Sequence, residues 1–250
     1  MQPSSLGGLR RELAHALIAL DYDGTLAPVV DDPGTAVPAE GARGVLVALS
    51  RRVGRLALVT GRPAQVVVDL GGLADVPGLV VLGQYGAERW AAGRLEVREP
   101  LPGVAAARAA LADLPGGAVL EDKRTALAVH TRRSVDPAGL LAALGARLER
   151  VAAENGLECH QGRFVVELRP PGDNKGAALR TLLDPMPSAA LYAGDDLGDL
   201  SAFAALDGLG VPVLRVCSDS AETPARLREQ ADLVVDGPRG VVALLRSLLD

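Results

Sequence analysis

Short apolar runs alternate with helical patterns in two separate segments of this 250-residue chain, and this alternation limits the possible folds more than any other feature. In the first segment, apolar runs at 17–20, 56–59 and 79–82 flank helical patterns at 39–52 and 63–70. The second segment has helical patterns at 174–183 and 200–206, and extended runs at 189–193, 210–216 and 233–235. Such alternation is typical of βαβ units around a parallel sheet. We therefore predict that both segments form one doubly wound α/β domain.

The stretch between these segments has a different pattern, in which extended runs outnumber helices. Its predicted helices span 104–114 and 137–154, and its predicted strands span 119–122, 126–132, 157–161 and 164–169. Proline-rich borders at 100–102 and 170–172 are typical of hinges. We predict a core of residues 1–100 and 172–250, with a smaller α/β domain, residues 101–171, inserted into it.

Charge and composition exclude some classes of partner. The formal net charge is −5 and no basic run is present, which argues against nucleic-acid binding, because phosphate backbones require a basic face. The apolar run at 14–20 is interrupted by His15 and is too short to span a bilayer, so we expect no membrane association. Cys159 and Cys217 lie far apart in the sequence, which favours a reduced, cytoplasmic protein.

Two carboxylates follow the first apolar run directly. Asp21 and Asp23 are separated by one residue, and residues two apart in an extended chain face the same side, so we expect both acids to converge on one point. Gly24 then permits a tight turn and a close approach of backbone to a ligand. Two such charges repel each other unless a cation such as Mg²⁺ relieves them. An acidic turn or a calcium loop remains the alternative interpretation.

A second acidic cluster follows the run at 189–193. It consists of Asp195, Asp196 and Asp199, and Asp195 is placed to complete a metal site at a neighbouring strand end. The alternative is helix capping, because an aspartate at a helix start satisfies free backbone N–H groups without any metal. Both interpretations can hold together, with Asp199 as the cap and Asp195 as the ligand.

Two further motifs complete the candidate site. Thr60 ends an apolar run, and Arg62 follows it at a predicted helix N-terminus, where backbone N–H groups can bind an anion. Lys175 begins a predicted helix, and it is one of only two lysines among 26 basic residues, the other being Lys123. Because arginine fills nearly all the other basic positions, a lysine here suggests a need for a compact ammonium beside a phosphate or a carboxylate.

In their order along the chain, Asp21 with Asp23, Thr60, Lys175 and Asp195 resemble the four motifs of the haloacid dehalogenase superfamily. The resemblance implies a Rossmann-like core with a mobile α/β cap. It also implies that Asp21 attacks phosphorus to give an aspartyl-phosphate, while Asp23 protonates the leaving oxygen and then activates water. Mg²⁺ would be held by Asp21, the backbone carbonyl of Asp23, and Asp195. Assisting roles fall to Thr60 and Lys175, and Asp196 and Asp199 would support the metal ligands.

Three polar pairs mark the predicted strands of the insertion. Within each pair the residues are separated by one position and so share one face of a half-buried sheet; the pairs are Glu121 with Lys123, His130 with Arg132, and Glu167 with Arg169. One interpretation is a solvated surface with weak ion pairs. The other is a surface that binds a sugar.

The chain resembles the trehalose-phosphate phosphatases in particular. The motifs are Asp21 to Pro28 with the trailing Asp32-Pro33, then Glu121-Asp122-Lys123, His130-x-Arg132 and Glu167-x-Arg169. The resemblance implies hydrolysis of trehalose 6-phosphate, a small-molecule sugar phosphate, and a functional link to a trehalose-phosphate synthase. It assigns sugar contacts in the insertion to Glu121, Lys123, His130, Arg132 and Glu167. From their positions in the turn after Asp21 and at the predicted helix N-terminus, Gly24 and Arg62 are also predicted to bind the substrate.

Three positions depart from that family's pattern. Gly198 and Leu200 stand where the family usually has Thr and Glu, and Tyr85 stands where it usually has His. A phosphatase acting on glucosylglycerol phosphate or sucrose phosphate is therefore an alternative. A non-catalytic relative that senses sugar phosphate or binds the synthase is another.

Overall fold

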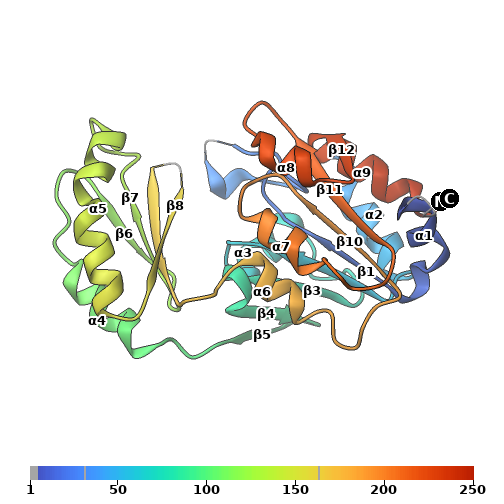
Figure 1. The fold of residues 1–250 in the computed structure, drawn as a ribbon, viewed down its shortest axis with the longest axis horizontal. Coiled ribbons are helices and arrows are strands. Elements are labelled where there is room, and N and C mark those ends of the chain that lie inside the picture. The colour runs from blue at the N-terminus through green and yellow to red at the C-terminus, as the bar shows by residue number, and fades with distance from the viewer. Residues whose placement is uncertain (1–4, 31, 163) are drawn as a thin grey trace. The chain divides into compact units, whose positions relative to one another are not determined.

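The computed structural model describes residues 5–30, 32–162 and 164–250. The chain divides into two compact units. Met1–Val97 and Asn174–Asp250 form the first, called the core unit here, and Arg98–Asp173 forms the second, called the inserted unit (Figure 1). The insertion predicted from the sequence, 101–171, lies within the inserted unit. No described helix combines the length and the apolar character needed to cross a bilayer.

The core unit is built on one mixed sheet. Its strands are β1 (Ala16–Leu20), β2 (Arg55–Val59), β3 (Leu79–Gly83), β4 (Glu88–Ala91), β5 (Arg94–Val97), β10 (Ala189–Gly194), β11 (Val213–Asp219) and β12 (Leu233–Asp236). In the described residues they lie in the order β12-β11-β10-β1-β2-β3-β4-β5. The strands from β12 to β3 are parallel, while β4 and β5 are antiparallel. The strand order reverses at β1, and α/β sheets bind ligands at the carboxyl ends of strands around such a point.

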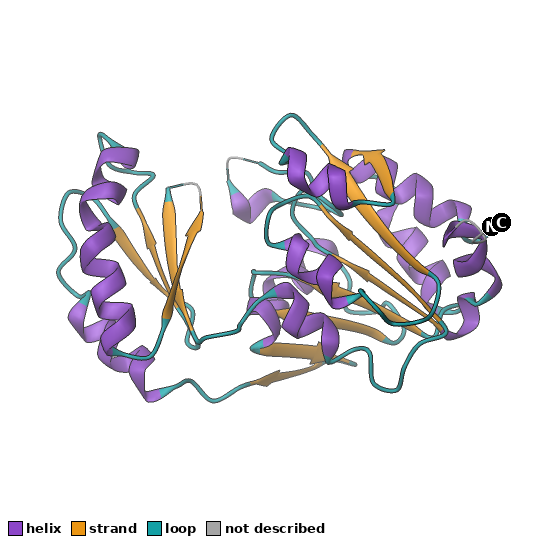
Figure 2. Cartoon of the chain, viewed as in Figure 1, coloured by secondary structure: helices purple, strands orange, loops and turns teal. Residues whose placement is uncertain are grey.

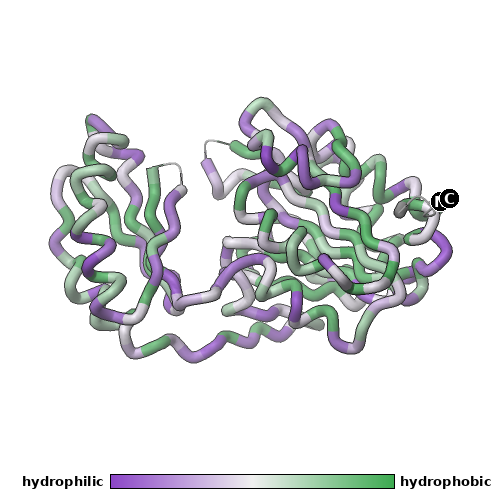
Figure 3. Tube along the Cα trace, in the orientation of Figure 1, coloured by the Kyte–Doolittle hydropathy of each residue, from purple (hydrophilic) through white to green (hydrophobic). Residues whose placement is uncertain are grey.

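Helices cover both faces of this sheet (Figure 2). One face packs against α1 (Ser5–Arg11), α2 (Ala42–Ser50), α3 (Ala64–Gly71) and α9 (Gly237–Ser247). The other packs against α6 (Lys175–Arg180), α7 (Asp199–Ala205) and α8 (Ala225–Gln230). All five residues of β1 are buried, which explains its continuous apolar sequence. Figure 3 shows hydrophobic residues concentrated along these strands. The predicted doubly wound α/β core is confirmed.

The antiparallel hairpin formed by β4 and β5 was not predicted from the sequence. Trp90 pairs with Leu95 across it, and Ala92 and Gly93 turn the chain with positive φ angles of 49° and 77°. Each strand has only four residues, and β5 is mostly exposed, so the hairpin lacks the long apolar run by which the parallel strands were recognised.

The inserted unit contains a second, antiparallel sheet. Its strands are β6 (Val119–Asp122), β7 (Leu127–His130), β8 (Glu158–Gly162) and β9 (Val165–Arg169), in the order β6-β7-β9-β8. Two helices, α4 (Pro102–Ala110) and α5 (Pro137–Glu154), pack on one face around Leu127, Val129 and Leu148. The described 3₁₀ turns, all in the core unit, are η1 (Leu13–His15), η2 (Pro33–Thr35) and η3 (Gln84–Gly86). Because β7 ends at His130, the prediction that Arg132 lies on a strand is wrong.

Candidate functional site

The chain leaves β1 at Asp21, whose backbone N–H donates to the carbonyl of Ala193 at 2.9 Å and so continues the parallel pairing for one more residue. Asp21 as a whole is only 3% exposed. Gly24 follows in a turn with φ of 70°, and a Cβ at this position would lie 2.0 Å from Asp195 Oδ2. Only glycine therefore allows the two strand ends to come this close.

Lys175 connects three of the carboxylates. It is the first residue of α6, where Asn174 accepts a hydrogen bond from Ala177 N at 2.8 Å and caps the helix. The Lys175 ammonium lies 2.8 Å from Asp21 Oδ2, 2.9 Å from Asp199 Oδ1 and 3.4 Å from Asp196 Oδ1. With a side chain only 5% exposed, Lys175 holds Asp21 and Asp199 in fixed positions.

Asp199 organises the loop after β10. Its Oδ2 accepts hydrogen bonds from Asp195 N at 2.9 Å and Asp196 N at 3.0 Å, and its Oδ1 accepts one from the Tyr192 hydroxyl at 2.7 Å. Asp199 is the first residue of α7 and Gly198 is the N-cap, so the expectation that Asp199 caps this helix is wrong. Its carboxylate instead binds backbone donors that precede the helix.

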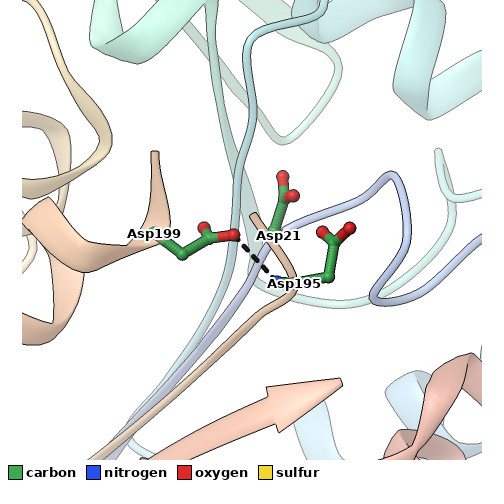
Figure 4. Close-up of side chains that lie close together, drawn as sticks. All are labelled: Asp21, Asp195 and Asp199. Atoms are coloured by element: carbon green, nitrogen blue, oxygen red, sulfur yellow. Dashed lines mark hydrogen bonds between the residues drawn. The ribbon is translucent and has the colours of Figure 1, made fainter. Parts of the chain in front are cut away.

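One carboxylate oxygen each from Asp21, Asp195 and Asp199 lie within 4.8 Å of one another (Figure 4). Burial raises the pKa of Asp21 well above its usual value and raises the pKa of Asp195 to about 7, with neighbouring carboxylates adding to both shifts. Burial also raises the pKa of Asp199, against the opposing effect of Lys175. Lys175 therefore offsets the negative charges of these acids only in part. Carboxylate oxygens are also the ligands that a hard divalent cation prefers.

Asp23 has a different partner from Asp21. Both of its carboxylate oxygens accept hydrogen bonds from Arg62, from Nε at 2.6 Å and from Nη2 at 2.7 Å. The Arg62 guanidinium lies 5.7 Å from the centre of the Tyr22 ring, and its Nη1 donates to the carbonyl of Pro33 at 2.6 Å. Asp21 and Asp23 thus have different side-chain partners, Lys175 and Arg62, and their convergence on one point stays a prediction.

Thr60 and Arg62 form a short segment between β2 and α3. Thr60 is 1% exposed, and its hydroxyl accepts a hydrogen bond from Arg62 N at 3.1 Å. The hydroxyl is therefore fixed at the carboxyl end of β2, next to the end of β1 in the sheet.

Ser218, which is fully buried near the end of β11, was not among the residues singled out from the sequence. Its hydroxyl donates to the carbonyl of Gly24 at 2.6 Å and fixes the turn after Asp21. Thr60 was singled out because it is a polar residue at the end of an apolar run. Ser218 also follows an apolar run, so the same pattern could have identified it.

The predicted sugar-binding residues lie in the inserted unit. Glu167 pairs with Lys123, and both side chains are 13% exposed. His130 Nε2 lies 2.7 Å from Glu121 Oε2, and this hydrogen bond lowers the pKa of Glu121. Glu121 and Glu167 flank Ala128 in the sheet register, on the face opposite the apolar core of this unit. Arg132 is exposed beyond the end of β7.

Known proteins resemble this chain over most of its length. Residues 19–232 match the family model described as trehalose-phosphatase. The chain is 32% identical to a trehalose-phosphate phosphatase of Mycobacterium avium, covering 89% of this chain and 62% of that protein. It is 33% identical to one of Mycobacterium marinum, covering 79% of this chain and 53% of that protein.

A solved structure has the same fold. It is the C-terminal domain of a Candida albicans trehalose-6-phosphate phosphatase, with a TM-score of 0.78 and 21% identity, covering 98% of this chain and 95% of that one. The matched region covers 62% and 53% of the two mycobacterial relatives, so the chain spans somewhat over half their length. With most of its length matched by the family model, the chain belongs to the trehalose-phosphatase family.

Proposed function

We propose that this chain is a magnesium-dependent phosphatase that hydrolyses trehalose 6-phosphate to trehalose and phosphate through an aspartyl-phosphate. The observation that carries the proposal is the carboxylate of Asp21, buried at the carboxyl end of β1 with one oxygen 2.8 Å from the Lys175 ammonium. The names of the mycobacterial relatives support the choice of sugar phosphate. The cytoplasmic location and a functional link to a synthase stay predictions.

Asp21 is the nucleophile in this proposal. One of its oxygens attacks phosphorus as the bond from phosphorus to the sugar oxygen breaks, which leaves the phosphoryl group on Asp21. Lys175 orients the carboxylate, because its ammonium binds both Asp21 and Asp199. Thr60, fixed at the adjacent strand end, and the Gly24 turn are proposed to hold the phosphate oxygens.

Asp23 transfers the protons. It first donates a proton to the leaving sugar oxygen, and it then takes one from the water that attacks phosphorus and releases phosphate from Asp21. Arg62 binds both carboxylate oxygens of Asp23, but each oxygen keeps a second lone pair, so the pairing leaves a place for one proton. Arg62 thus orients the acid, and it is also proposed to contact the phosphate.

Mg²⁺ fits the acidic cluster because the oxygens of Asp21, Asp195 and Asp199 converge and their charges are only partly offset by Lys175. We propose that Asp21, Asp195 and the backbone carbonyl of Asp23 hold the ion. Asp199 and Asp196 would support them through the hydrogen bonds of this loop. When bound, the ion reduces the repulsion between the nucleophile and the phosphate and neutralises charge during transfer.

The polar face of the inserted unit is proposed to bind the sugar. Hydrogen bonds to charged groups suit the hydroxyls of a disaccharide, and the residues proposed to make them are Glu121, Lys123, His130, Arg132 and Glu167. Glu121 and Glu167 flank Ala128 in the sheet register, so the Glu121–His130 pair and the Lys123–Glu167 pair lie close together on this face.

The test is phosphate release from a panel of sugar phosphates with and without Mg²⁺. The panel contains trehalose 6-phosphate, glucosylglycerol phosphate and sucrose phosphate. We expect Mg²⁺-dependent release with a preference for trehalose 6-phosphate, lost in Asp21→Asn and retained in Asp236→Asn, which changes an exposed aspartate at the end of β12. Preference for another sugar phosphate would reject trehalose 6-phosphate as the substrate but leave the proposed reaction mechanism intact. No release from any ester would favour the non-catalytic alternative.

A further inference from the structure

Glu88 is a buried carboxylate to which the reaction described above gives no role. It is the first residue of β4 and is 7% exposed. Its Oε2 accepts a hydrogen bond from Ala64 N at 2.6 Å, and its Oε1 accepts one from Gln84 Nε2 at 2.7 Å. Each oxygen therefore binds a donor from a different segment of the core unit.

The first of these donors starts a helix that has no cap of its own. Ala64 is the first residue of α3, and the N-cap position is Pro63, which makes no side-chain capping bond. The first N–H groups of a helix lack partners within the helix. Glu88 supplies this partner from a strand 24 residues away, and so fixes the point at which the segment from Thr60 to Pro63 enters α3.

The second donor belongs to the turn that packs against the same segment. Gln84 N donates to the carbonyl of Arg62 at 2.9 Å, and Tyr85 N donates to that of Thr60 at 3.0 Å. Gln84 and Tyr85 have φ angles of 47° and 58°, a backbone conformation that residues other than glycine rarely adopt. Holding this turn therefore requires specific contacts, and the bond from Gln84 to Glu88 is one of them.

The close packing leaves this segment little freedom to adjust. A Cβ on Gly83 would lie 2.4 Å from Ala64 N, and one on Gly61 would lie 2.6 Å from the Tyr85 hydroxyl oxygen. The same segment carries Arg62, whose guanidinium binds both oxygens of Asp23. A continuous set of contacts therefore leads from Glu88 through Ala64 and Gln84 to Arg62, and from there to Asp23.

We propose that Glu88 is a positioning residue for proton transfer: it fixes the Thr60–Arg62 segment, and Arg62 in turn orients the Asp23 carboxylate toward the leaving oxygen. This inference rests on the proposed function. The loss of activity on replacing Glu88 should therefore depend on the leaving group. A sugar oxygen needs a proton as it departs, whereas p-nitrophenolate is stable enough to depart without one.

The experiment compares kcat/KM for the preferred sugar phosphate and for p-nitrophenyl phosphate in the wild type, Glu88→Ala and Glu88→Gln. We expect Glu88→Ala to lose about tenfold to a hundredfold on the sugar phosphate, where proton transfer suffers, and only about threefold on p-nitrophenyl phosphate, where the loss is limited to the phosphate contacts of Thr60 and Arg62. Glu88→Gln should regain most of the activity, because its amide can still accept from Ala64 N and can bond to a reoriented Gln84. Glu96→Ala, which removes an exposed carboxylate from neighbouring β5, is the matched control.

Hydrogen exchange gives a readout that does not depend on activity. Amides of residues 60–64 should exchange faster in Glu88→Ala than in the wild type or Glu96→Ala. Equal losses on both substrates, or unchanged exchange, would overturn the proposal. If the wild type hydrolyses no sugar phosphate, the proposed function fails, and exchange alone decides whether Glu88 fixes the segment. Should Glu88→Ala not fold, Glu88→Asp, shorter by one methylene, gives the same comparison.

Discussion

Without metal, the core unit should lose stability as the pH rises from 5 to 8. The pKa of Asp195 is raised from 3.8 to about 7, chiefly by burial, and the pKa of Asp21 is raised in the same direction. A carboxyl group with a raised pKa in the folded state contributes stability that is fully present below its unfolded pKa. This contribution is lost as the pH rises through the folded pKa.

The size of the effect follows from the shift. About three pKa units correspond to on the order of 4 kcal/mol over the full titration, of which the range from pH 5 to 8 covers the larger part. Asp195 is partly exposed, so solvent reduces the figure, and we expect a loss of about 2 kcal/mol in the free energy of unfolding. Mg²⁺ at about 100 times its dissociation constant should restore about 2.7 kcal/mol at pH 8.

The assay is urea unfolding followed by tryptophan fluorescence. Trp90 is the chain's single tryptophan, and it is buried in β4, so its signal reports on the core unit alone. Asp195→Asn should show a flatter pH profile and little response to Mg²⁺, whereas Asp236→Asn should behave as the wild type. Constant or rising stability of the metal-free wild type between pH 5 and 8 would refute the reasoning, as would the same slope in Asp195→Asn.

Two further predictions concern the inserted unit. Lys123→Met should lower kcat/KM for the sugar phosphate at least tenfold while leaving kcat/KM for p-nitrophenyl phosphate unchanged. Arg150→Met, on the exposed surface of α5, should change neither value. Equal loss on both esters would reject the assignment of Lys123 to sugar binding. Leu148→Ala should destabilise the inserted unit by about 2–5 kcal/mol, because Leu148 is 1% exposed in its core. Circular dichroism would detect this change, and an equal shift in the Trp90 fluorescence transition would contradict the division into units.

Much of the fold could be predicted because the central parallel strands β1, β2 and β10 are buried on both faces and therefore appear in the sequence as continuous apolar runs. The same runs locate their own carboxyl ends, which is why Asp21, Thr60 and Asp195 could be singled out from local sequence. Lys175 was found from composition, since the chain keeps only two lysines.

The contacts between strand ends could not be predicted in the same way. The bond from Arg62 to Asp23 depends on how the chain turns after β1, where the two-residue alternation has ended. The bonds from Ala64 to Glu88 and from Ser218 to Gly24 join segments 24 and 194 residues apart, and nothing in the local pattern encodes such pairings.

The most direct test of the central claim is to locate the phosphoryl group during turnover. The protein is mixed with trehalose 6-phosphate and Mg²⁺, quenched rapidly in acid and digested, and its peptides are analysed by mass spectrometry. We expect a transient phosphoryl group on Asp21, absent in Asp21→Asn. Phosphate release with no phosphoryl group on the protein, or with the group on Asp23, would contradict it.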